Sequence, residues 1–365
     1  GKRRVSVHEK FLEWNECWLE PTRLPPELAS EVRAAARLGR IPSWAPRIGT
    51  VPWVVRGLPR LVSKPIAHMP LHLWEQIGLV VSQDNSCRYC YGMTRALLKV
   101  LGYDASYVQQ LERELHLADL APADRLALEF ARKVSHANPR AGSADHAQLA
   151  DAGLSRTAIA EIAYCAAANV SANRLATLLA FPSDFTEATA DRLAIRLLRP
   201  LIARRIRGKL REPEALPAPN AGPCADLVAA LDGSPAAGVL RRVIDEAIAS
   251  PVLPKRTKLL MLAVIGRAVG CDRAESEAKA ELAAEGFTAR DVEQVLANLS
   301  SPKLDAREAL LVPFARETVR YQVPTMQQRT RELSGRLTRE ELIEAVGIAA
   351  LANGVCRLSV ILRTC

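Results

Sequence analysis

No stretch of this chain is apolar over the roughly 20 residues that a membrane-spanning helix requires. The basic start "GKRRVSVHEK" is also not followed by the apolar core of a secretion signal. The eight cysteines are mostly scattered and do not form the dense framework of a small disulfide-bonded domain. We therefore expect no membrane span, a reducing compartment and a cytoplasmic location.

Alternating runs of β-branched residues are scarce, which argues against β-sheets. Alanine and leucine dominate a chain that is 49% apolar, so the sequence favours helices around a sizeable core. A chain of 365 residues is too long for one ordinary core and indicates two domains. The predicted fold class is all-α.

Metal and haem sites lack their usual ligand patterns. A structural zinc site commonly combines two close ligand pairs, but the chain has a single CxxC and six dispersed histidines. Haem attachment would need a histidine directly after Cys90, and Tyr91 stands there. We expect no metal and no bound cofactor.

The formal net charge is +9, and part of it is concentrated between residues 192 and 212. The apolar residues of this segment fall at roughly helical spacing, which predicts a basic amphipathic helix. Such a helix could attract an acidic partner or a membrane face, or it could face solvent or another subunit. No nucleic-acid-binding motif accompanies it, so we expect no nucleic-acid partner. The basic residues are Arg192, Arg196, Arg199, Arg204, Arg205, Arg207, Lys209 and Arg211.

Two segments of the chain are similar at an offset of 184 residues. At this offset "CRYCYGMTRALLKVLGYDASYVQQL" aligns with "CDRAESEAKAELAAEGFTARDVEQV", and Cys87 falls on Cys271. The same offset places "LALEFARKV" on "LLVPFARET" and Asn169 on Asn353. The alignment predicts two copies of one helical unit.

This duplication predicts four segments. Residues 1–65 form an N-terminal arm, and residues 66–183 form the first copy. Residues 184–249 hold the basic helix and a Pro/Ala-rich linker, "REPEALPAPNAGP". Residues 250–365 form the second copy.

Cys87 and Cys90 are the one closely spaced cysteine pair. The turn-forming residues 84–86 predict a helix that starts near Cys87 and ends at Gly102. Cys87 then lies in the first helical turn, and Cys90 lies one turn later on the same face. Unpaired backbone N–H groups and the helix macrodipole favour a thiolate at this position. The pair is a candidate redox couple.

Glu75 is the candidate proton-transfer group. If residues 71–83 and 87–101 form a helical hairpin, Glu75 lies close to Thr94, at the inner end of the face that carries the two cysteines. A carboxylate in this apolar helix would have a raised pKa and could pass a proton. The alternative is an ordinary helical glutamate that pairs with an arginine.

These residues form a recognisable pattern: Glu75, eleven intervening residues, Cys87 and Cys90 within "SQxNxCxYC", then Gly102-Tyr103 and "LALEFARKVS". The pattern resembles the alkylhydroperoxidase D/carboxymuconolactone decarboxylase superfamily. The resemblance covers the first copy, and it implies two tandem alkylhydroperoxidase D-like helical domains in a homo-oligomer. It also implies a redox pair of Cys87 and Cys90, with Cys90 deprotonated and Glu75 as the relay carboxylate.

The chain departs from the family pattern at Thr94, where the family has a histidine. A threonine hydroxyl can donate and accept hydrogen bonds but is not a base near neutral pH. Either Glu75 reaches Cys90 through Thr94 or a water, or another residue serves. His72, one helical turn before Glu75, is the candidate substitute.

The second copy departs further from the pattern. Leu259 stands in place of the glutamate, and Ala274 stands in place of the second cysteine. We predict that this copy does no redox chemistry and serves as a scaffold. Cys271, left without a second cysteine, is then a buried small residue.

The expected activity is that of a peroxidase-type thiol oxidoreductase. Its substrate would be an organic hydroperoxide or another small molecule, and its reductant a dithiol protein. Trp74, Tyr89, Tyr91 and Met93 would line an apolar approach to the thiols. Two alternatives remain: a decarboxylase or isomerase that uses acid–base groups, and a catalytically weak or non-enzymatic oligomeric scaffold.

Overall fold

The computed structural model describes residues 14–35, 39–113, 115, 118–136, 141–183, 200–204 and 222–362. Within these ranges the regular secondary structure is helical and there is no strand, which confirms the predicted all-α fold class. Of the predicted basic helix only residues 200–204 are described, and they are helical. The rest of that prediction lies outside the described residues.

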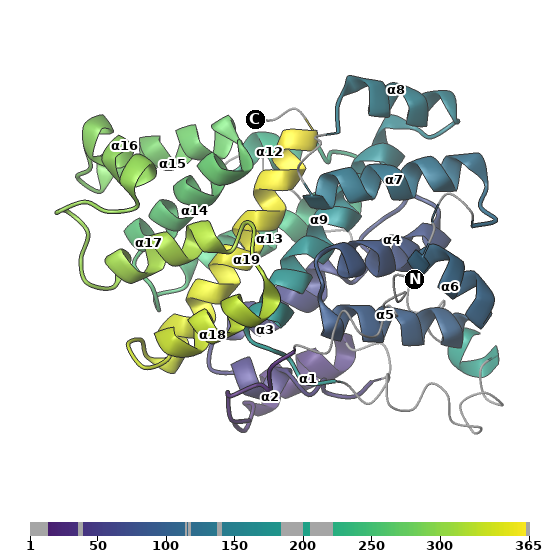
Figure 1. The fold of residues 1–365 in the computed structure, drawn as a ribbon, viewed down its shortest axis with the longest axis horizontal. Helices are drawn as coiled ribbons and strands as arrows, with labels where there is room; N and C mark the ends of the chain where they lie inside the picture. Colours follow the sequence, from purple (N-terminus) through teal and green to yellow (C-terminus); the bar gives the residue numbers. More distant parts are fainter. Residues whose placement is uncertain are drawn as a thin grey trace, which may run out of the picture.

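The helices of the first part of the chain are α1 (Pro26–Ala35), α2 (Ala45–Ile48), α3 (Pro52–Leu61), α4 (Leu71–Asp84), α5 (Arg88–Leu101), α6 (Ala105–Arg113), α7 (Pro122–His136), α8 (Ser143–Asp151) and α9 (Arg156–Leu178). Those of the second part are α12 (Ala225–Ala229), α13 (Pro235–Ala249), α14 (Lys255–Val269), α15 (Asp272–Ala284), α16 (Ala289–Asn298), α17 (Glu308–Glu317), α18 (Val323–Leu333) and α19 (Arg339–Ile361). Figure 1 shows α4–α8 on one side of α9 and α19, and α14–α17 on the other.

The helix order of the first part recurs in the second part. Helix α4 begins at Leu71 and α14 begins at Lys255, 184 residues later. Helices α5 and α15 begin at Arg88 and Asp272, with the same offset. The helices before them, α3 and α13, pack against each other. Helix α3, from the expected N-terminal arm, therefore has a counterpart in the second part, whereas the predicted domain limits stay predictions.

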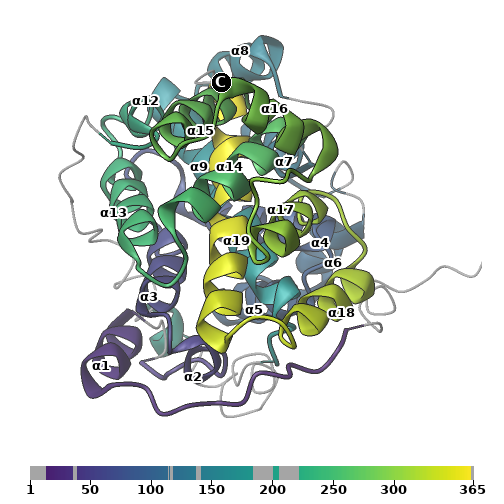
Figure 2. The same ribbon diagram turned by 90° about the vertical axis from the view of Figure 1, so that its left-hand side faces the viewer.

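Helices α9 and α19 form the seam between the two parts. They pack against each other at the centre of the molecule, as Figures 1 and 2 show. A methyl group at Gly354 would lie only 2.7 Å from the carbonyl oxygen of Ala167 and would also collide with Ser171. The absence of a side chain at Gly354 therefore allows the two helix backbones to approach this closely.

The two seam helices are long and almost entirely buried. Among the described residues, α19 alone is long and apolar enough to cross a membrane by length and composition. Its apolar window is 94% buried inside the protein, as is typical of the core helix of a globular fold.

Two buried arginines connect the halves across this seam. Arg174 of α9 donates hydrogen bonds from Nε to the carbonyl oxygen of Thr318 (3.0 Å) and from Nη2 to that of Val319 (3.1 Å). Arg357 of α19 donates from Nε to the carbonyl oxygen of Ser135, in the last turn of α7 (3.0 Å). Each arginine therefore binds carbonyl groups at the end of a helix of the other half, where no intrahelical donor remains.

Two buried glutamates bind the chain near the starts of α4 and α14. Glu161 of α9 accepts hydrogen bonds from the backbone N–H groups of residues 67–69 and from the hydroxyl of Ser234. Glu344 of α19 instead pairs with Lys258 Nζ at 2.7 Å. Both glutamates are fully buried, so these contacts form away from water.

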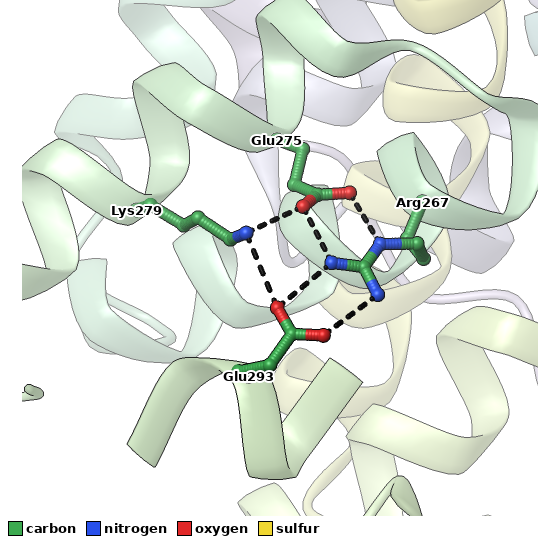
Figure 3. Close-up of polar contacts among 4 residues, drawn as sticks. All are labelled: Arg267, Glu275, Lys279 and Glu293. Atoms are coloured by element: carbon green, nitrogen blue, oxygen red, sulfur yellow. Dashed lines mark hydrogen bonds and ion pairs between the residues drawn. The ribbon is translucent and has the colours of Figure 1, made fainter. Parts of the chain in front are cut away.

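An ion-pair cluster connects α14, α15 and α16 in the second half. Arg267 binds Glu275 at 2.6 Å and Glu293 at 2.9 Å, and Lys279 binds Glu275 at 2.6 Å. Figure 3 shows the two cations placed between the two carboxylates. The hydrogen bond from Arg267 is the largest cause of a Glu275 pKa of about 2.

We predict that Glu275→Gln destabilises the protein in a pH-dependent manner. The pKa of Glu275 is lower in the folded chain than in the unfolded chain, so its contribution is complete above about pH 4.5 and is lost as the pH falls towards 2. We expect a loss of about 1 kcal/mol at pH 7, as for solvent-screened pairs. Thermal unfolding at pH 7 and pH 2.5 measures it, with the exposed Glu332→Gln as control. A difference of equal size at both pH values would contradict the prediction.

Candidate active site

The cysteine pair lies at the start of α5, as the sequence predicts. Cys87 is itself the N-cap residue, and its Sγ accepts a hydrogen bond from the backbone N–H of Cys90 at 3.4 Å. The preceding turn closes through a bond from the Cys87 N–H to the carbonyl oxygen of Ser82 (2.9 Å). Ser86 adopts a positive φ of 52° in this turn. Gly102 ends the helix in the left-handed conformation, also as expected.

The two thiols differ in burial and in acidity. Cys87 is fully buried, whereas Cys90 is half-buried. Burial raises the pKa of Cys87, but hydrogen bonds from the Cys90 thiol and N–H outweigh it together with smaller effects of the nearby Thr177 and the charge of Arg174, so the pKa is below its usual value. The pKa of Cys90 is well above its usual value, because its thiol proton is held by Cys87 and because of burial.

The directions of these two pKa shifts favour the thiolate on Cys87 and the proton on Cys90. This order is the reverse of the one that the family resemblance implied, in which Cys90 is deprotonated. The hydrogen bonds from the Cys90 thiol and N–H are the largest causes that lower the pKa of Cys87, and Thr177 and the charge of Arg174 add to them. Asn173 is the one neighbour whose hydrogen bond lowers the pKa of Cys90, and it does not compensate.

A polar face of α9 lies along the thiols. Asn169, Asn173 and Thr177 follow one another at four-residue spacing and therefore share one face of the helix. Thr177 acts on Cys87 and Asn173 on Cys90, so the two helices run antiparallel at this contact. The sequence analysis did not identify Asn173, Arg174 and Thr177 as site residues. Their spacing in the otherwise apolar stretch "AANVSANRLATLLA" was the available signal.

Thr94 lies at the inner end of the same face. It is buried, and a Cβ at Gly78 would lie 3.5 Å from its Oγ1 and 3.3 Å from Oδ1 of Asn169. Gly78 of α4 thus leaves space in which Thr94 and Asn169 come together. In place of the family histidine, this site therefore holds the small neutral side chains of Thr94 and Asn169.

Glu75 forms a buried ion pair with a lysine. Its Oε1 lies 2.5 Å from Nζ of Lys64, and both side chains are at most 5% exposed. Lys64, in the turn after α3, adopts a positive φ of 66°. Glu75 is therefore paired with a cation from the segment before α4. This pairing resembles the predicted alternative to a proton relay, in which Glu75 pairs with an arginine.

His72 lies away from this pair, at the surface. Its side chain is 44% exposed, and Nε2 is 2.8 Å from Oδ2 of Asp124 at the start of α7. His68, four residues earlier, binds the carbonyl oxygen of Gly233 at 3.1 Å. This spacing is one that metal sites use, but the described residues contain no group of three or more histidine, cysteine or acidic side chains that could hold a metal.

The predicted apolar approach residues are part of the core. Trp74, Tyr89 and Tyr91 are buried and Met93 is partly buried. The Tyr91 hydroxyl donates to Glu112 at 2.7 Å. These side chains pack the helices together.

A cavity of about 690 Å³ lies at the seam instead, beside the turn that precedes α5. Asn85 and Ser86 line it from the first half, and Tyr321 and Arg357 line it from the second. Arg174 lies between them, with Nη1 3.2 Å from the Tyr321 hydroxyl and its guanidinium 4.6 Å from the centre of that ring. Since Arg174 also acts on Cys87, the cavity and the thiol pair share one residue.

The second half has no thiol pair at the corresponding place. Cys271 is the N-cap residue of α15 and is fully buried, as predicted, and it is disulfide-bonded. Leu259 and Ala274 are buried among apolar neighbours.

A comparison with protein-family models gives no match, and neither does a comparison with curated proteins. Two solved structures are similar to part of the chain. One is the crystal structure of an alkylhydroperoxidase AhpD core, an uncharacterized peroxidase-related protein from Ralstonia eutropha JMP134, which is 21% identical with a TM-score of 0.43 over 48% of this chain and 97% of that one. The other is an uncharacterized peroxidase-related protein from Silicibacter sp. TM1040, 22% identical with a TM-score of 0.43 over 47% and 93%.

We predict that the reduced protein ionises one thiol below the usual thiol pKa. Thiolate absorbance at 240 nm, followed from pH 5 to 10, should show one step below about pH 8.5. Cys87→Ser should abolish this step, and Arg174→Met should move it to higher pH because the nearest cation is removed.

Cys224→Ser is the matched control, since burial raises the pKa of Cys224 to about 12 and its loss should leave the step unchanged. A low-pH step that survives Cys87→Ser and disappears in Cys90→Ser would show that the thiolate is on Cys90.

Proposed function

We propose that this protein is a peroxidase-type thiol oxidoreductase in which Cys87 and Cys90 cycle between dithiol and disulfide. The observation that carries the proposal is the hydrogen-bonded thiol pair at the start of α5, in which the pKa of Cys87 is lowered and that of Cys90 is raised. A reduced pair with one thiol of lowered pKa is activated for attack on an electrophilic oxygen or sulfur.

The first step uses the difference in burial. Cys87 is fully buried and Cys90 is half-buried, so a hydroperoxide meets the pair at Cys90. The Cys90 sulfur attacks the terminal peroxide oxygen, and its S–O bond forms as the O–O bond breaks. The Cys90 proton passes to Cys87 along the hydrogen bond between the sulfurs, and the departing alkoxide takes a proton from water. Cys87 thus acts as the base, which needs no histidine at position 94.

The second step closes the disulfide. Cys87, now a thiol, attacks the sulfenic sulfur of Cys90, and the S–O bond breaks with release of water. The two sulfurs have then given two electrons to the peroxide. A dithiol protein restores the pair by attacking the more accessible sulfur, Cys90, through a mixed disulfide. The reductant, the homo-oligomer and a cytoplasmic location are parts of the proposal that rest on the family resemblance.

We expect one equivalent of tert-butyl hydroperoxide to be consumed per reduced chain, with formation of one Cys87–Cys90 disulfide. Peptide mass mapping measures the disulfide. Cys87→Ser should trap a Cys90 sulfenic acid that dimedone labels, and it should form more slowly because the base is lost. Cys90→Ser should give no label at Cys87, since that sulfur is buried.

Thiols that stay reduced under these conditions would favour the alternative of a non-enzymatic scaffold. Label at Cys87 in the Cys90→Ser protein would instead assign the first attack to Cys87.

A separate experiment tests the relay predicted for Glu75. Glu75→Gln alone leaves Lys64 buried without its counter-charge, which costs about 3–5 kcal/mol and obscures a catalytic role. The double variant Lys64→Met/Glu75→Gln removes both charges together. Because Cys87 is the base in our mechanism, we expect the double variant to retain most of the peroxide reduction. A folded but inactive double variant would support the relay instead.

A further inference from the structure

Two buried guanidinium groups converge on one carbonyl oxygen at the wall of the seam cavity. Nη2 of Arg174 lies 3.1 Å from the carbonyl oxygen of Val319, and Nη2 of Arg357 lies 3.2 Å from the same oxygen. The residues are 5% and 2% exposed, and both line the cavity. The two Nη2 atoms are therefore neighbours at one point of the cavity wall.

Among the described residues, each guanidinium has one N–H group without an acceptor at this point. Arg174 uses Nε for Thr318, and Nη1 for Asn85 and Tyr321. Arg357 uses Nε for Ser135, and both N–H groups of Nη1 for Asn353. A guanidinium has five donors, so one N–H of each Nη2 remains beyond the bond to Val319.

No carboxylate pairs with the two arginines within the described part of the chain. All their hydrogen-bond partners are neutral carbonyl, amide or hydroxyl groups. Arg320 also lines the cavity. The one carboxylate among the residues that line the cavity is Asp84, which binds Arg132 at 2.8 Å and His136 at 3.2 Å. Burial and the charge of Arg174 lower the pKa of Arg357 to about 9, as expected for cations without a counter-ion.

The cavity has space and apolar surface for more than an inorganic ion. Its volume of about 690 Å³ is within the range of small-molecule sites. Trp14, Val323 and Pro324 contribute apolar surface to its wall. A ligand that fits is amphipathic, with a negative group at the arginines and an apolar body.

We propose that the seam cavity binds a small organic carboxylate, whose two oxygens bridge Nη2 of Arg174 and Nη2 of Arg357. Paired N–H···O bonds from guanidinium groups are the geometry that carboxylates favour. The site goes beyond the peroxide chemistry, because it contains neither sulfur and does not depend on thiol turnover.

Binding at this site also acts on the thiol pair. Arg174 is the cation that helps to lower the pKa of Cys87. A carboxylate beside Arg174 offsets part of its positive charge, so the Cys87 pKa rises when the ligand binds. The reciprocal effect follows by linkage: ionisation of Cys87 weakens the binding of the carboxylate.

The test is calorimetric titration of the fully reduced protein with 4-phenylbutyrate at pH 7, with the uncharged 4-phenylbutyramide beside it. We expect saturable binding of one carboxylate per chain, and at least tenfold weaker binding of the amide. Arg357→Gln should weaken carboxylate binding at least tenfold, and the exposed Arg331→Gln should leave it unchanged. If Arg357→Gln fails to fold, Val323→Trp keeps both arginines and should abolish binding by filling the cavity.

The Cys87→Ser/Cys90→Ser protein separates this proposal from the proposed function. It should bind 4-phenylbutyrate at least as tightly as the natural chain does, because it lacks the Cys87 thiolate that opposes binding, whatever the outcome of the peroxide assay. In the natural chain the ligand should move the thiolate step at 240 nm to higher pH. Equal binding of acid and amide, binding that is unaffected by both Arg357→Gln and Val323→Trp, or competition by inorganic phosphate at equal concentration would overturn the proposal.

Discussion

The close approach of α9 and α19 is the contact on which the other features depend. Gly354 lets the two backbones meet at Ala167 and Ser171, and this brings Arg174 and Arg357 within reach of carbonyl groups in the opposite half. A side chain at position 354 would separate the helices and break both sets of hydrogen bonds. Burying two guanidinium groups is unfavourable unless most of their donors are satisfied, so the seam tolerates little displacement.

The Arg174 side chain has three roles in the structure. It caps the end of α17, it contacts Asn85 in the turn before α5, and its charge lowers the pKa of Cys87. The acidity of the thiol pair in the first half therefore depends on the packing of the second half. This gives the second half a physical role even though Leu259 and Ala274 replace the residues of the motif.

Local sequence signals predicted the helical fold and the start of α5 at Cys87, because capping residues and helix-ending glycines act over a few positions. The helix order at the 184-residue offset also agrees with the predicted alignment. The order of thiol acidity depends mainly on hydrogen bonds within the CxxC segment, and the contributions of Thr177 and Arg174, far along the chain, could not be read locally. The hairpin geometry that placed Glu75 near Thr94 likewise did not include Lys64, which arrives from the segment before α4.

The carbonyl partners of Arg174 lie 144 and 145 residues further along the chain. During synthesis α9 therefore leaves the ribosome well before α17 and α19 are made. Its apolar and basic surface stays uncovered until then. Until they arrive, Tyr321, Arg357 and the far wall of the cavity are missing, and Arg174 is not fixed beside Cys87. A nascent first half would then lack the contribution of a fixed Arg174 to the acidity of Cys87, and its thiol pair would reach its final state only when α19 has docked.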